Sequence, residues 1–304
     1  MNITDPIYSD ANKAREHLEA LHWPNGPVCA HCGCMGRITK LQGKSTRPGV
    51  HKCNDCTRLF TVTVGTVMED SKIPLNKWLM AFALYASGKK GFSAHQLHRN
   101  LGITYKSAWF MAHRIREAMD GAATTGPLGG HDKIVEADET YVGGKAKNRA
   151  TRKPAPKKAV VALVERDGRA RSFHVANVNA KTLRPLIVTN VDRASVLMTD
   201  ESPVYVRTGR EFTAHYTVNH SAQQYVTTGG FKHSNTAENF FSIFKRGVIG
   251  TYHHMSEAHL GRYCAEFDFR YNTRTISDAE RTDEAIKGAR GKRLMYRQPS
   301  SLAA

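Results

Sequence analysis

Two pairs of cysteines near the N-terminus constrain the fold of this chain more than any other feature. Cys29 and Cys32 form the first pair, Cys53 and Cys56 form the second, and twenty residues separate the two pairs. A gap of two residues lets both sulfurs of a tight turn face one ion, and tetrahedral zinc needs two such turns. The spacing therefore predicts a four-cysteine zinc site with bound Zn²⁺.

Two alternatives for these cysteines have to be weighed. A pair of disulfides would need an oxidising compartment, and the polar residues 1–18 contain no apolar segment of a secretory signal. Cys34 competes with Cys32 as a ligand, although its spacing from Cys29 is less suited to a tight turn that faces one ion. Strand-like runs at residues 50–52 and 59–64 flank the second pair, so we predict a zinc ribbon.

The charge of the chain predicts a polyanionic partner. Lysine and arginine outnumber aspartate and glutamate by 44 to 27 over 304 residues, a formal net charge of +17, while 40% apolar residues suffice for folded cores. Residues 145–158 contain seven basic residues and no acid, which favours phosphate contacts over a merely solvated loop. No apolar run approaches the length of a membrane span, so we expect a cytoplasmic, nucleoid-associated prokaryotic protein. Charge alone does not separate DNA from RNA or from an anionic membrane.

Residues 74–120 have helical spacing. Leu75, Leu79, Phe82 and Tyr85 share one helix face that ends at Gly88. A short helix over 94–100 and a longer one over 104–119 are then predicted on either side of a turn at Gly102. Two helices joined by such a turn are typical of a helix-turn-helix, although an ordinary helical hairpin would look the same. The residues of the second helix that we expect to contact DNA are Lys106 and Arg114.

Beyond the glycine-rich segment 121–130, the pattern changes to short strands alternating with helices. The predicted elements are strands over 134–142, 159–165, 171–176 and 195–199, a helix over 181–189 and a long helix that starts near Asn235. This order predicts an α/β domain.

Two aspartates fall where an α/β sheet commonly carries its functional site. Asp138 lies inside the first strand, and Asp200 ends the apolar run before it. If the two strands pair side by side, both carboxylates converge on one point and suit Mg²⁺ or Mn²⁺. Glu136 shares the strand face of Asp138, whereas Glu139 faces away, because side chains alternate with period two. A carboxylate in a buried strand is costly unless it is paired or bound to a cation.

The third acid, Glu238, permits two interpretations. With Asn235 as the N-cap, Glu238 takes the third helical position of a capping box, a purely structural role. Lys245 follows two helical turns later on the same face, and Phe240, Ile243 and Phe244 are expected to bury on the opposite side.

These residues together resemble a known family, the ISXO-like insertion-sequence transposases. The similarity runs from about Cys29 to Arg274 and rests on the ribbon together with the blocks GTVMEDSKIPLNKW, GFSAHQLHRNLGITYKSAWFMAHRIREAM, VEADETYVGG and HSNTAENFFSIFKRGVIGTYHH. The resemblance implies a DDE transposase with an RNase H-like mixed sheet and flanking helices, preceded by a zinc ribbon and a helix-turn-helix-like segment. It also implies double-stranded DNA as the partner and a homo-oligomer on that DNA.

The resemblance assigns roles to single residues. Asp138, Asp200 and Glu238 match the three catalytic and metal-binding acids, and Lys245 matches the basic residue that follows them; Asn235 is a minor competitor for the third position. Lys153, Lys157 and Lys158 of the basic run are expected to contact DNA. The predicted segments are an N-terminal part with the zinc ribbon (1–66), a helix-turn-helix-like region (67–121), a linker (122–132), the catalytic domain (133–275) and a C-terminal tail (276–304).

Two other classes of protein remain open from the sequence. One is a regulator with a zinc ribbon and a helix-turn-helix that binds DNA without cutting it. The other is an RNase H-like nuclease that hydrolyses DNA without joining strands. DNA cleavage separates the first from a transposase, and strand transfer separates the second.

Overall fold

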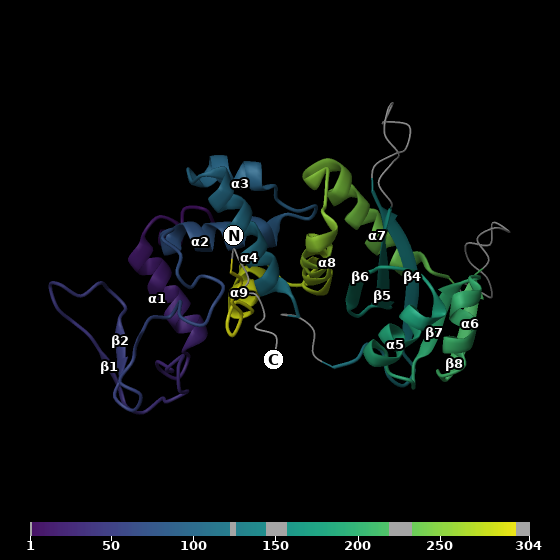
Figure 1. Ribbon diagram of the computed structural model, residues 1–304, viewed down its shortest axis with the longest axis horizontal. Coiled ribbons are helices and arrows are strands. Elements are labelled where there is room, and N and C mark those ends of the chain that lie inside the picture. Colours follow the sequence, from purple (N-terminus) through teal and green to yellow (C-terminus); the bar gives the residue numbers. More distant parts are fainter. Residues whose placement is uncertain (1, 122–125, 144–156, 219–232, 296–304) are drawn as a thin grey trace, which may run out of the picture. The chain divides into compact units, whose positions relative to one another are not determined.

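The computed structural model describes residues 2–121, 126–143, 157–218 and 233–295 (Figure 1). The chain divides into two compact units. Unit 1 contains residues 1–88, 92–122 and 276–304, and unit 2 contains residues 89–91 and 123–275. Within the stretches that the structure describes, no helix has both the length and the apolar character needed to cross a membrane.

The N-terminal part of unit 1 contains a small three-stranded antiparallel sheet. A short 3₁₀ turn (Pro6–Tyr8) and helix α1 (Ala11–His22) precede the strands β1 (Ile38–Lys40), β2 (His51–Cys53) and β3 (Leu59–Phe60), which pair in the order β1-β2-β3. The rings of Trp23, His51 and Phe60 pack on one another with centroids 5.2–5.8 Å apart. Phe60 and the buried cysteines Cys29 and Cys53 form a small core, against which Trp23, Ile38 and Val64 pack.

The rest of unit 1 is helical. It consists of α2 (Leu75–Ser87), α3 (Ala94–Leu101), α4 (Tyr105–Met119) and α9 (Asp278–Lys287). The two predicted helices and the turn between them are confirmed: Ser93 and Gln96 form a capping box at the start of α3, and Gly102 ends it with a φ of +57°. Residues 276–304, expected as a tail, contain α9, which packs against α1, α2 and α4.

Unit 2 is built on a mixed five-stranded sheet. Its strands are β4 (Ile134–Val142), β5 (Lys158–Glu165), β6 (Ala170–Val175), β7 (Val196–Asp200) and β8 (Ala214–Val218), in the order β6-β5-β4-β7-β8. The strands β6, β5 and β4 run antiparallel in succession, whereas β7 and β8 are parallel to β4. The predicted α/β class is therefore confirmed, although the sequence analysis did not identify β8 or the helix α6 (Pro203–Gly209).

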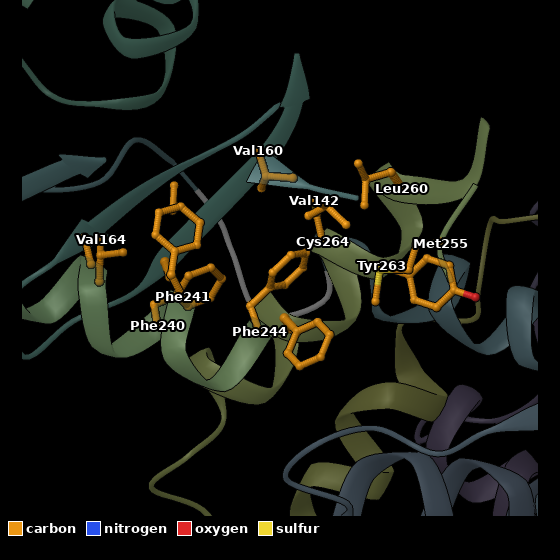
Figure 2. Close-up of a cluster of buried hydrophobic side chains, with 14 residues drawn as sticks. Val142, Val160, Val164, Phe240, Phe241, Phe244, Met255, Leu260, Tyr263 and Cys264 are labelled. Carbon is orange, nitrogen blue, oxygen red and sulfur yellow. The ribbon is translucent and has the colours of Figure 1, made fainter. Parts of the chain in front are cut away.

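Helices cover both faces of this sheet. Helices α7 (Asn235–Gly247) and α8 (Glu257–Asn272) pack on one face, where Phe240, Phe241 and Phe244 meet Val160 and Val164 of β5 (Figure 2). Helices α5 (Ala180–Asn190) and α6 pack on the other face through a second buried cluster. A π-helical turn, Val248–Tyr252, continues directly from α7.

Candidate functional site

The four predicted zinc ligands lie together in the ribbon. All four sulfur atoms are within 4.8 Å of one another, with Cys29 Sγ 3.7 Å from Cys56 Sγ and Cys32 Sγ 3.6 Å from Cys53 Sγ. Zinc–sulfur bonds of ~2.3 Å at tetrahedral angles place sulfurs about 3.8 Å apart. A disulfide would need a sulfur–sulfur distance of about 2.05 Å, and all of these cysteines are free thiols. The donor set therefore fits Zn²⁺ and not a pair of disulfides.

Cys34 lies beside this set and does not complete it. Its sulfur is close to those of Cys53 and to a carboxylate oxygen of Asp55, while Cys32 joins the other three cysteines. The hydrogen bond with Asp55 raises the pKa of Cys34, which disfavours the thiolate that binds metal. By contrast, hydrogen bonds from the backbone N–H groups of Cys56 and Asp55 lower the pKa of Cys53 to about 6.

The sheet register brings the two aspartates together. Strands β4 and β7 pair in parallel, with Ile134 opposite Val196 and Glu136 opposite Met198, a constant offset of 62 residues. The paired stretch ends there, and Asp138 and Asp200 each lie two residues beyond its last pair on their own strand, with Asp200 close enough to repel the Asp138 carboxylate. The expectation that these two strands pair side by side is confirmed.

The electrostatics of Asp138 fit a bound cation. Burial raises the pKa of Asp138 to about 6, and repulsion from Glu139, Asp200 and Glu238 adds to the shift. Among the described residues, only the backbone N–H of Glu139 lowers the pKa of Asp138, by donating a hydrogen bond to Asp138 Oδ1 at 2.8 Å. A cation would relieve this repulsion between carboxylates. Unlike the four cysteines, however, the ligand atoms of Asp138, Asp200 and Glu238 do not all lie within 4.8 Å of one another in the described structure.

Glu139 faces the opposite side of the sheet, as predicted. It accepts a hydrogen bond from the hydroxyl of Tyr205, a fully buried residue of α6. Burial, followed by repulsion from Asp200, raises the pKa of Glu139. Glu139 therefore contributes negative charge behind the aspartates but is itself held by α6.

The start of helix α7, which carries Glu238, differs from the predicted capping box. The N-cap residue is Ser234 rather than Asn235, and its side chain makes no capping hydrogen bond, so the predicted capping box is wrong. Glu238 and Lys245 are both exposed, on the side away from the phenylalanines. Ile243, which we expected to be buried, is 38% exposed, and Phe241 occupies the core in its place.

Glu136 performs the capping role instead. Its carboxylate is fully buried and accepts hydrogen bonds from the backbone N–H groups of Thr236 (2.8 Å) and Ala237 (3.0 Å). Arg166 Nε donates to the same carboxylate at 2.6 Å, and another guanidinium nitrogen of Arg166 donates to the carbonyl oxygen of His233 at 2.7 Å. An anion at the positive end of a helix is stabilising, so Glu136 and Arg166 fix the start of α7 to β4. No local sequence signal marks this contact, because 100 residues separate Glu136 from Thr236.

The residues predicted to contact DNA differ in their exposure to solvent. Arg114 is 8% exposed, and its guanidinium donates to the carbonyl oxygens of Leu294 (3.1 Å) and Glu69 (3.0 Å), so that prediction is wrong. Lys106 is exposed in the first turn of α4, and Lys157 is exposed as well. Lys158 is half-buried and donates to the carbonyl oxygen of Met255 at 3.2 Å. Lys153 lies outside the described residues, as does most of the basic run.

Comparisons with known proteins identify two domains of the chain. Residues 9–58 match the model of the transposase zinc-ribbon domain and include all four clustered cysteines. Residues 127–272 match the model of the ISXO2-like transposase domain and include Asp138, Asp200 and Glu238. Over 278 residues the chain is 27% identical to an uncharacterized protein in transposable element ISH50 of Halobacterium salinarum, a match that covers 85% of this chain and 90% of the relative.

Proposed function

Because this chain belongs to the ISXO2-like transposases, we propose that it cuts DNA at the ends of an insertion sequence and joins the freed end to target DNA. One observation carries this proposal: Asp138 and Asp200 lie on adjacent parallel strands, and Asp200 and Glu238 both interact electrostatically with Asp138. The mixed sheet, with helices on both faces, supports the RNase H-like fold that accompanies this chemistry.

In the proposed site, Asp138, Asp200 and Glu238 would hold two divalent cations, Mg²⁺ or Mn²⁺. Such ions supply charge stabilisation for the attacking and leaving oxygens of a phosphodiester. The protein's own part is to hold three anionic side chains on a rigid sheet and an anchored helix, so that little reorganisation accompanies the reaction. Lys245, exposed on the Glu238 side of α7, is suited to contact a phosphate near the cleaved bond.

The reaction proceeds in two displacements at phosphorus. Water first attacks a phosphodiester at the element's end, and the P–O bond that breaks leaves a free 3′-hydroxyl. That hydroxyl then attacks a phosphodiester of the target, so one P–O bond forms as another breaks. No external energy source and no covalent bond to the protein are needed.

DNA binding by unit 1 is part of the same proposal. The first turn of α4 exposes Lys106 next to Tyr105, whose ring stacks on His95 of α3 with centroids 4.3 Å apart. The rest of α4 is mostly buried, so only its N-terminal turn is free to reach a groove, which is the part of a recognition helix that contacts bases. We also propose that the protein acts as a homo-oligomer on DNA.

A cleavage and joining assay with the purified full-length protein tests the proposal. The substrate is labelled duplex DNA from either end of the insertion sequence that encodes this chain, with Mg²⁺ or Mn²⁺. Cleavage together with strand transfer from a pre-cut 3′-hydroxyl end is the expected result. Cleavage without joining would identify a nuclease, and tight binding without cleavage would identify a regulator; either result overturns the proposal.

A further inference from the structure

One stripe of exposed residues runs along helix α7 and into the π-helical turn that follows it. Glu238, Ser242, Lys245 and Ile249 follow one another at intervals of four, three and four residues, which places them on one helix face. All four side chains are exposed, and the phenylalanines bury the opposite face. At 1.5 Å per residue, Ile249 lies about 16 Å along the axis from Glu238, the length of about five base pairs.

Positively charged or protonatable side chains surround the far end of this stripe. Arg246 is exposed and is held against the helix by bonds to Ser242 O and Ser242 Oγ, both at 3.2 Å. The backbone of Lys90, distant in sequence, also reaches this end, because a Cβ on Gly247 would meet the Lys90 carbonyl oxygen at 2.8 Å. The side chains of Lys89 and Lys90 are both exposed. The other exposed members of this group are His253 and His254.

The turn that carries Ile249 is anchored on both sides. Val248 and Tyr252 pack against the buried cluster between α7, α8 and the sheet. The Tyr252 hydroxyl donates to the buried carboxylate of Glu266, and its ring lies edge-on to Tyr263 with centroids 4.8 Å apart. Ile249, which directly follows the packed Val248, is 74% exposed, the highest value of any large apolar side chain in the part of the chain described.

We propose that this surface, from Lys245 to His254 with Lys89 and Lys90, binds duplex DNA beside the catalytic acids. The cations contact phosphates, and Ile249 enters the minor groove and loosens the stacking of one base step, as apolar wedges of DNA-bending proteins do. An anionic membrane offers the same combination of charge and apolar interior, but the stripe begins at Glu238, which favours a phosphodiester polymer that extends from the catalytic site. Only the direction of the bound DNA, which extends from the catalytic acids toward Ile249, rests on the proposed function.

The wedge is tested in an Asp138→Asn background without added Mg²⁺ or Mn²⁺, so that no cleavage is required. The probe is a 20-base-pair duplex of G·C pairs with one central T-A step, in which 2-aminopurine replaces the adenine; such steps unstack most easily. We expect binding to raise the 2-aminopurine fluorescence and Ile249→Ala to lose that rise. Val206→Ala, which removes an apolar side chain that is 46% exposed on α6, is the matched control and should keep it. A full rise with Ile249→Ala, or an equal loss with Val206→Ala, overturns the wedge.

The phosphate contacts are tested in the same background by the salt dependence of binding. Lys89→Ala with Lys90→Ala, and separately Arg246→Ala, should each flatten the slope of log affinity against log salt, by up to ~0.9 for each phosphate that is no longer neutralised. Lys181→Ala on α5 is the charge-matched control and should leave the slope unchanged. Unchanged slopes in the first two variants, or stronger binding to phosphatidylserine vesicles than to the duplex, overturn the surface as a DNA site. Failure of cleavage by the unsubstituted protein would instead count against the proposed function alone.

Discussion

The two sites of this molecule are assembled in different ways. The four cysteines all lie between residues 29 and 56, and each pair is brought together by its own tight turn. The three acids of the proposed catalytic site come from β4, β7 and α7, so their arrangement depends on the pairing of two strands and on a helix that begins 35 residues after the second acid. Short-range geometry thus defines the zinc site, whereas only the completed fold defines the acidic site.

The two sites also depend on metal to different extents. The ribbon has a core of a few aromatic rings and cysteines, too small to hold its short strands by burial alone. Asp138 and Asp200 lie on a sheet whose two faces are both covered by helices, and Glu238 lies on one of those helices. Loss of a cysteine ligand should therefore unfold the ribbon, whereas loss of one of the three acids should leave unit 2 folded but inactive.

The largest effect is expected from Glu238→Gln. As a metal ligand, Glu238 should be irreplaceable by an amide, and cleavage and joining should fall by on the order of a thousand-fold, the scale for losing one preorganised electrostatic partner. Asp138→Asn and Asp200→Asn should behave alike. The measurement is cleavage and strand transfer on labelled end DNA, with folding checked by circular dichroism. Near-normal cleavage by Glu238→Gln beside an inactive Asp138→Asn would place the third ligand elsewhere, first at Asn235.

The next largest effect concerns the ribbon. Cys53→Ser should abolish zinc binding and the folding of this module, because metal-binding free energy is folding free energy in such small domains. Cys34→Ser is the matched control, since it removes a neighbouring thiol that lies outside the four-sulfur set. Metal analysis should find about one zinc per chain in the unsubstituted protein and in Cys34→Ser, and none in Cys53→Ser. Full zinc content in Cys53→Ser, or its loss in Cys34→Ser, would give the fourth ligand position to Cys34.

The sequence predicted best what short-range patterns encode. The zinc ligands, the caps of α3 and the strand β4 need only spacing, a Ser or Gly at the right place, or a β-rich run. The pairing of β4 with β7, the strands that carry Asp138 and Asp200, was predictable only as a condition, because each aspartate belongs to a run typical of a buried strand.

The errors concern residues whose role depends on distant partners. Arg114 looks like the polar face of a recognition helix, yet carbonyl oxygens from other parts of unit 1 accept its hydrogen bonds in the interior. Asn235 looks like an N-cap, but the carboxylate of Glu136 supplies the cap from β4, and no local pattern reveals that. Helix α9 was missed as part of unit 1 because its packing partners, α1 and α2, lie near the other end of the chain.

Arg166→Ala tests how far the acidic site depends on such distant contacts. The substitution leaves the buried Glu136 without its guanidinium, and breaking a buried pair costs about 3–5 kcal/mol; the remaining N–H bonds favour the lower figure. Arg184→Ala is the control, because it breaks an exposed pair with Glu211 worth up to about 1 kcal/mol. Urea unfolding measures both costs. Equal losses in the two variants would show that the start of α7 is held mainly by other contacts, and the contrast with the locally formed zinc site would weaken.

The smallest effect is expected from an ion pair in unit 1 that joins helix α1 to helix α9, which are far apart in the sequence. His17 of α1 lies 3.0 Å from Asp283 of α9, and this hydrogen bond raises the pKa of His17 although burial opposes the shift. A histidine with a raised pKa contributes stability that is fully present below its unfolded value of about 6.5 and is lost as pH rises through the folded value. The unfolding free energy of the unsubstituted protein should therefore exceed that of Asp283→Asn by up to about 1 kcal/mol more at pH 6 than at pH 8.5, because both groups are partly exposed. Urea titrations of the two proteins at both pH values measure the difference, and the contribution of the zinc thiolates cancels because both proteins share it. A difference that does not change with pH would show that α9 is held to α1 by packing alone.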